Sequence, residues 1–227
     1  MPGLVQSEEA EKFMSMMVLP HQLNISLGDP SKHDIETAAS IRRAHGIVVD
    51  GIEKVSRLPD DASRTEAEKH HVARQIAQKT EKVLVATKGF IERRASALTE
   101  SASADIDATF ETKLERQAIH GELRAYVRDL AKKGETATIR DLMNESQEVA
   151  SVVVHSPRIL LGLNEKVHWN LREDAVKRYL PNAYANLQKS IELDGVAAKY
   201  GDVIQRMHRS LYRGVLADKY VRTRVEI

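Results

Sequence analysis

Two glutamate–histidine pairs are the residues of this chain whose spacing could hold a metal ion. Glu68 and His71 are three residues apart, and Glu165 and His168 repeat that spacing. Residues at i and i+3 share one face of a helix, and two such pairs with glutamates from two further helices build the di-iron or di-manganese centre of ferritin-like bundles. The spacing therefore permits a ferritin-like di-metal carboxylate site.

Chance explains this pattern nearly as well. The chain has 9 histidines among its 227 residues, and with roughly twenty glutamates about one such pair is expected at random. The second pair also lies between Pro157 and Pro181, where a long bundle helix is not expected. We therefore expect no metal site and keep the di-metal protein as the weaker alternative.

Other catalytic signatures are missing from the sequence. It has no glycine-rich phosphate loop, no G-x-S-x-G elbow and no H-E-x-x-H motif. The absence of cysteine excludes disulfides, thiolate metal sites and cysteine nucleophiles. The sequence predicts a protein that is not an enzyme and that uses no cofactor.

A basic, tyrosine-bearing segment near the C-terminus is the second group of residues with possible chemistry. Its cations recur three and four residues apart around a tyrosine and could follow phosphates while the ring stacks on a base. The alternative is a solvated face that meets an acidic protein partner. No helix-turn-helix signature supports sequence-specific DNA binding. The residues are Arg206, Arg209, Tyr212, Arg213, Arg222 and Arg224.

The composition indicates that long helices must position these residues. Charged residues make up 30% of the chain, apolar residues 42% and aromatic residues only 4%, a balance typical of all-α proteins with aliphatic cores. The net charge of +1 gives no overall attraction to nucleic acid. We therefore predict a long antiparallel helical bundle followed by a compact subdomain of shorter helices.

The first long helix is predicted from the capping box Ser31–Asp34 to a point before Pro59. Within it, apolar positions alternate by three and four residues and form one stripe, as in a coiled coil. We interpret this stripe as an interaction seam. Its members are Ile41, His45, Val48, Ile52 and Val55.

Two more long helices are expected to follow. A second capping box at 63–66 opens a helix that should run to about Leu98 and pair antiparallel with the first. A polar break at 99–103 then separates it from a third helix, which Gly134 ends. We accordingly divide the chain into an N-terminal arm (1–30), a three-helix bundle (31–133) and a shorter-helix subdomain (134–227).

Both ends of the chain carry features of docking segments. The arm contains Phe13, Met14 and Met17, and methionine-rich surfaces adapt well to a partner. The same residues would equally suit a lid folded onto the chain's own core. The last residues, 220–227, alternate apolar and polar side chains, which predicts an extended tail able to add a strand to a neighbour.

These features together favour a non-enzymatic structural or assembly protein, which associates with itself or bridges other protein subunits. A bacteriophage virion or neck component would be one example. The alternatives are a nucleic-acid-associated protein using the basic segment and the ferritin-like protein. Without a basic leader or an apolar run of about 20 residues, we expect a cytoplasmic protein, or a particle assembled there, with no secretion and no membrane partner.

Overall fold

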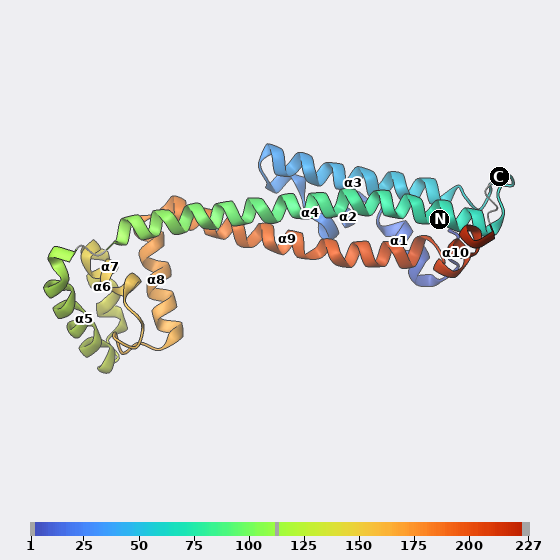
Figure 1. Cartoon of the computed structure of the whole chain (residues 1–227). Coiled ribbons are helices and arrows are strands. Elements are labelled where there is room, and N and C mark those ends of the chain that lie inside the picture. Colours follow the sequence, from blue (N-terminus) through green and yellow to red (C-terminus); the bar gives the residue numbers. More distant parts are fainter. Residues whose placement is uncertain (1–2, 112–113, 224–227) are drawn as a thin grey trace. The chain divides into compact units, whose positions relative to one another are not determined.

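The computed structural model describes residues 3–111 and 114–223, which form helices and no strand (Figure 1). The predicted all-α class is confirmed. Contacts divide the chain into two compact units: unit 1 joins Met1–Arg94 to Glu192–Ile227, and unit 2 is Ala95–Ile191. These units group the chain differently from the three consecutive segments expected, because two long helices each contribute to both units.

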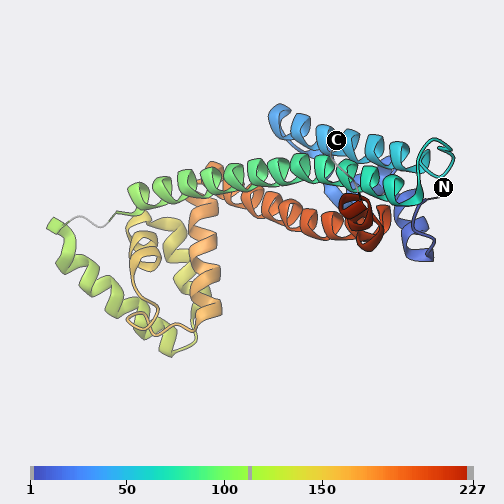
Figure 2. The same ribbon diagram turned by 45° about the vertical axis from the view of Figure 1, so that its right-hand side comes forward.

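Unit 1 is built around three long helical segments that lie side by side in both views (Figures 1 and 2). They come from α3, α4 and α9, and the shorter α1, α2 and α10 pack along or beside them. A 3-10 turn, η1, precedes α3. The bounds are α1 (Glu8–Met16), α2 (Pro20–Leu27), η1 (Pro30–Lys32), α3 (Ile35–Ser56), α4 (Glu66–Phe110), α9 (Pro181–Leu211) and α10 (Gly214–Thr223).

The long helices begin at side-chain caps close to the predicted ones. Asp34, rather than Ser31, caps α3, because its carboxylate accepts a hydrogen bond from the backbone N–H of Thr37 at 3.1 Å. Thr65 caps α4 in the same way through Glu68 N–H at 3.3 Å. The sequence therefore predicted the capping residues of both helices to within a few positions.

The predicted break at 99–103 is wrong, because α4 continues without interruption to Phe110. Serine, threonine and alanine are weaker helix breakers than glycine or proline, and packing decides here. Ala102 is fully buried, and the hydroxyls of Thr99 and Ser190 on α9 hydrogen-bond at 2.7 Å. These contacts hold the polar stretch in the helix.

The expected third helix is accordingly divided. Its first part belongs to α4, and its second part is the separate helix α5 (Gln117–Lys132). Gly134 ends α5 as predicted: it has φ +75°, and Glu135 N–H donates to Leu130 O at 3.0 Å. This is a Schellman motif, which needs a residue with positive φ.

Unit 2 has its own core around α7 (Gln147–His155). Six consecutive residues of this helix, 149–154, are buried, and Phe110 and Leu171 join the same cluster. The run Val152–Val154 is therefore helical, as expected, despite its β-branched side chains. The other elements of the unit are η2 (Leu114–Arg116), α5, α6 (Thr136–Glu145), α8 (Glu165–Tyr179) and the adjoining parts of α4 and α9.

The C-terminal segment is helical where the structure describes it. Helix α10 includes residues 220–223, so the predicted extended conformation is wrong for them, and the remaining residues of the expected tail lie outside the described part. Among the described residues, no helix is both long and apolar enough to cross a membrane.

Polar contacts from α3 and α9 fix the C-terminal end of α2 in unit 1. Lys199 Nζ donates to Ile25 O at 3.1 Å, and the hydroxyl of buried Tyr200 donates to Leu27 O at 3.0 Å. His45 Nε2 donates to Gly28 O at 3.1 Å. Carbonyl groups at a helix end lack intrahelical donors, so α2 obtains its C-terminal partners from two other helices.

We predict that Gly28→Ala destabilises the protein by about 2–4 kcal/mol. Gly28 has φ +99° and ψ 151°, a conformation almost restricted to glycine, and an added Cβ would lie 2.7 Å from Val196 Cγ1. The backbone strain costs about 1–3 kcal/mol, and overpacking costs a similar amount. Urea unfolding at equilibrium measures the difference.

Gly46→Ala is the matched control. Gly46 lies in the exposed middle of α3 with open space around its Cα, so alanine should stabilise the helix by up to about 1 kcal/mol. Equal effects of the two substitutions would contradict the packing assigned to Gly28.

Candidate functional site

The predicted interaction seam is covered by the chain itself. Ile41, Val48, Ile52 and Val55 are each at most 1% exposed, and His45 is tied to Gly28. Burial lowers the pKa of His45, which keeps its ring neutral in this apolar setting. These side chains stabilise unit 1 and are not available to a second copy in this fold, so they are not proposed as a contact surface.

The arm residues are also part of the core. Phe13, Met14 and Met17 are at most 2% exposed, and the guanidinium of Arg206 lies 5.4 Å from the centre of the Phe13 ring. Of the two interpretations of this segment, the structure supports the one in which it folds onto its own chain.

The two glutamate–histidine pairs of the weaker di-metal alternative belong to different units of the chain. Glu68 and His71 lie in unit 1, whereas Glu165 and His168 lie in unit 2. His168 Nε2 instead donates to Val153 O at 3.0 Å. Within residues 3–111 and 114–223, no group of three or more histidine, aspartate or glutamate side chains is placed to hold a metal ion.

The basic segment is partly neutralised by the chain. Arg206 pairs with Asp202 at 3.7 Å, and Tyr212 donates its hydroxyl proton to His208 at 2.9 Å. Arg209 and Arg213 are exposed. Arg222 is exposed on α10, and Arg224 lies outside the described residues.

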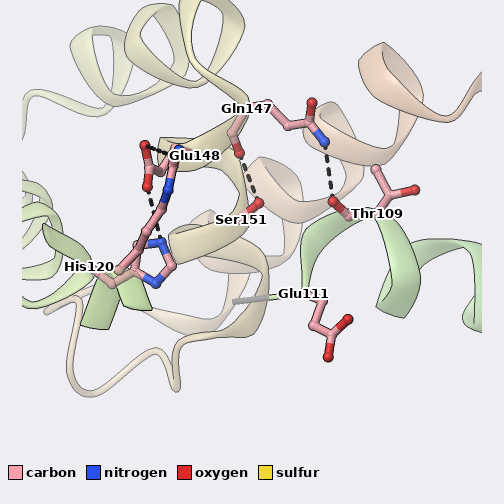
Figure 3. A pocket seen from close by; sticks show the side chains of 7 residues that line it. Thr109, Glu111, His120, Gln147, Glu148 and Ser151 are labelled. Carbon is pink, nitrogen blue, oxygen red and sulfur yellow. Dashed lines mark hydrogen bonds and ion pairs between the residues drawn. The ribbon is translucent and has the colours of Figure 1, made fainter. Parts of the chain in front are cut away.

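A pocket of about 290 Å³ lies in unit 2 between the end of α4 and helices α5 and α7 (Figure 3). Glu148 is one of its lining residues and pairs with Arg116 at 3.0 Å and with buried His120 at 3.3 Å. The hydrogen bond from Arg116 holds the pKa of Glu148 below its usual value. The other lining residues are Thr109, Glu111, Gln147 and Ser151.

The polar groups of this pocket mainly bind one another. Gln147 Nε2 donates to Thr109 O at 3.1 Å, and Ser151 Oγ donates to Gln147 O at 2.9 Å. Figure 3 shows these bonds running along and between the helices, while Glu111 points away from them. Because the Ser151 hydroxyl is directed at the main chain and not at His120, the pocket has no nucleophile aligned with a base.

A histidine cluster joins the start of α4 to the junction of α9 and α10 in unit 1. His70 Nδ1 accepts the backbone N–H of Arg213 at 3.0 Å. His71 Nδ1 accepts from Arg74 at 3.3 Å, and its ring lies 4.7 Å from that of Tyr220. We call His70, His71 and His208, together with the residues that hydrogen-bond to them, the histidine cluster.

His70 and His71 act as hydrogen-bond acceptors, and each therefore needs an unprotonated ring nitrogen. Burial lowers the pKa of His70, with Glu66 opposing and Arg213 adding to the shift. His208 bridges two side chains: its Nε2 donates to Glu81 at 3.0 Å, and its Nδ1 lies 2.9 Å from the Tyr212 hydroxyl. Burial raises the pKa of Tyr212 above its ordinary value.

An exposed apolar turn in unit 2 is the most unusual surface feature of the described residues. The segment 157–163, here called the apolar turn, connects α7 to α8. Ile159 is 78% exposed and Leu160 is 49% exposed, whereas the adjacent Leu161 is fully buried. Trp169, in the second turn of α8, is 66% exposed. Tryptophan is enriched where a few side chains dominate a protein interface.

The apolar turn is held in one conformation. Leu160 N–H donates to Pro157 O at 2.9 Å, and Leu163 N–H donates to Arg158 O at 3.1 Å. Gly162 has φ +64°, and a Cβ there would lie 3.3 Å from Arg128 Cγ on α5. The backbone thus presents Ile159 and Leu160 to solvent from a rigid base.

Four cations in the apolar turn or close to it along α5 and α8 form no ion pair with a carboxylate of the described residues. Arg128 contacts Gly162, Arg158 belongs to the turn, and Lys166 and Arg172 lie on α8 on either side of Trp169. All four are exposed. Elsewhere in unit 2, Arg116 and Arg140 form ion pairs with Glu148 and Asp174. The turn therefore combines apolar side chains with uncompensated positive charge.

We predict that acidification loosens α10. When the contact between His70 and Arg213 opens, the pKa of His70 returns to its ordinary value near 6.5, which is higher than its pKa in the closed fold. The open state therefore binds more protons as the pH falls from 7 to 5, and the closed state loses stability relative to it. Loss of the hydrogen bond from Arg213 N–H to His70 should raise the hydrogen-exchange rates of the Arg213 and α10 amides about fivefold, after correction for the intrinsic exchange rates. Hydrogen exchange measured by mass spectrometry detects this change.

His70→Gln supplies the control, since an amide side chain does not titrate. This variant should lose most of the pH effect, and the amides of α6, which contains no histidine, should be unaffected in both proteins. Protection of α10 that is identical at pH 5 and pH 7 would contradict the role assigned to His70.

Comparison with protein-family models, with curated proteins and with solved structures finds no match to this chain.

Proposed function

We propose that this protein is a non-enzymatic structural subunit, which contacts copies of itself or other protein components of an assembly through the apolar turn. The supporting observation is the exposure of Ile159 and Leu160 side by side on a hydrogen-bonded turn. A cytoplasmic assembly, including a virion or neck assembled there, is the setting we propose.

The energetics favour a contact role for the turn. Ile159 is 78% exposed and Leu160 49% exposed in the isolated chain, so a partner that covers both would contribute most of about 1.5–3 kcal/mol for Ile159 and about half of that for Leu160. The turn is already ordered, so little backbone entropy is lost on binding. An ordered apolar surface of this kind is costly to maintain in solution and is typical of contact sites.

Ile35 and Val215, the two most exposed large apolar residues of the described part, are not paired in this way. Ile35 is 87% exposed and Val215 is 83% exposed, but each stands at the start of its helix without an equally exposed apolar neighbour in the sequence. Single exposed apolar side chains are common in globular proteins. The pairing of Ile159 with Leu160 distinguishes the apolar turn.

A nucleic-acid-binding role has less support. The partners of Arg206 and Tyr212 lie within the chain, which leaves Arg209, Arg213 and Arg222 as exposed cations of the basic segment. In unit 2, α7 follows α6 after a single residue, whereas the turn of a helix-turn-helix has about three or four residues. The buried residues 149–154 of α7 also cannot enter a DNA groove.

We predict that Ile159→Asp weakens association at least tenfold. The change removes an apolar contact worth about 1.5–3 kcal/mol and adds a charge to the buried centre of the interface. Sedimentation velocity over a range of protein concentrations measures the loss. Because Ile159 is exposed, the thermal unfolding midpoint should change little.

Ile35→Asp is the matched control, since it makes the same change at an equally exposed isoleucine of unit 1. It should associate like the wild-type protein. A photo-crosslinking residue in place of Leu160 extends the test to partners other than a second copy. A wild-type chain that stays monomeric, and that crosslinks from position 160 to no other protein in the cells that make it, would refute the proposed function.

A further inference from the structure

We infer that the surface that receives the apolar turn is the acidic side of the C-terminal part of α4, on a second copy of this chain. The inference rests on the proposed function and names the partner of the same turn. Both surfaces belong to unit 2, and each is exposed in the isolated chain.

The receiving surface is one face of α4. Positions separated by three, four or seven residues share a helix face, and the exposed residues of this face are short or acidic. We call it the acidic α4 face. Its residues are Ala97, Glu100, Ala104, Asp107 and Ala108.

The charges of the two surfaces are complementary. Between residues 95 and 112 the chain has four acidic residues and no basic residue. Glu100 and Asp107 are exposed and have no cation within 4.0 Å among the described residues, just as Arg158 and Lys166 have no carboxylate. Opposite potentials on two surfaces guide their approach and fix their register.

The shapes of the two surfaces are also compatible. The alanines of the acidic α4 face leave the helix backbone accessible between the carboxylates, and small residues allow close approach of another element. The protruding side chains of Ile159 and Leu160 can therefore contact the alanines while the cations beside them reach the acids. The acids and the cations would then lie around an apolar centre, as in typical interfaces.

A contact between two different surfaces of identical chains is head-to-tail. Such a contact repeats from copy to copy and produces a closed ring or an open filament, according to the rotation between neighbours. Its ion pairs remain close to solvent and are screened by salt over a Debye length of about 10 Å at 0.1 M. Association should therefore decrease as the ionic strength rises.

A charge-exchange experiment on the full chain tests the inference. One variant reverses the turn (Arg158→Glu with Lys166→Glu), and the other reverses the acidic α4 face (Glu100→Lys with Asp107→Lys). Each variant alone brings like charges together and should associate at least tenfold more weakly than the wild type. In an equimolar mixture, each surface again finds an opposite charge, so association should return. Sedimentation velocity at low ionic strength provides the measurement.

The result that overturns the inference is association of the acidic-face variant as tight as that of the wild type, or a mixture that stays dissociated. A wild type that is monomeric at all concentrations overturns it as well. The proposed function is tested separately from this inference. If Ile159→Asp still causes dissociation, or if position 160 crosslinks to another protein, the turn remains a contact site. Only the acidic α4 face is then excluded as the surface that receives it.

Discussion

Unit 1 depends on the close packing of neighbouring helices against α4, and this packing is possible because the buried side chains of α4 are small. Its most deeply buried positions include Ala73, Ala77 and Thr80, so neighbouring helices must approach closely to exclude solvent. Gly51 makes this possible on α3, since a Cβ there would lie 2.9 Å from Thr80 Oγ1. Larger residues such as Leu84 and Ile91 then fill the remaining space. The shape of α4 thus decides which side chains of α3 and α9 can be large.

Many polar residues that could do chemistry serve this packing. Tyr200 and Lys199 supply donors to the end of α2, and burial raises the pKa of the Tyr200 hydroxyl, which therefore stays protonated as a donor. His168 and His45 bind main-chain carbonyls. An all-helical chain has many helix ends with unpaired backbone groups, and polar side chains that satisfy them are not free for catalysis or for metal binding.

The sequence predicted the helices better than the surfaces. Periodicity identified the stripe from Ile41 to Val55 as one apolar face, but it cannot distinguish a face covered by α4 and α9 from one covered by a second copy, since both bury the same residues. The apolar turn was missed for a related reason. A run of Ile159, Leu160 and Leu161 suggests core, and its spacing does not indicate that the turn before Gly162 leaves the first two residues exposed and buries the third.

The size of the apolar turn limits how the protein can assemble. Burial of the exposed parts of Ile159 and Leu160 provides about 2–4 kcal/mol in total, and exposed ion pairs add about 0.2–1 kcal/mol each. Association costs an estimated 4–15 kcal/mol in lost translational and rotational freedom, so one such contact between two copies is weak. A ring changes this balance, because its closing contact forms within one particle at high effective concentration. We therefore expect cooperative assembly, with little dimer between the monomer and the complete particle.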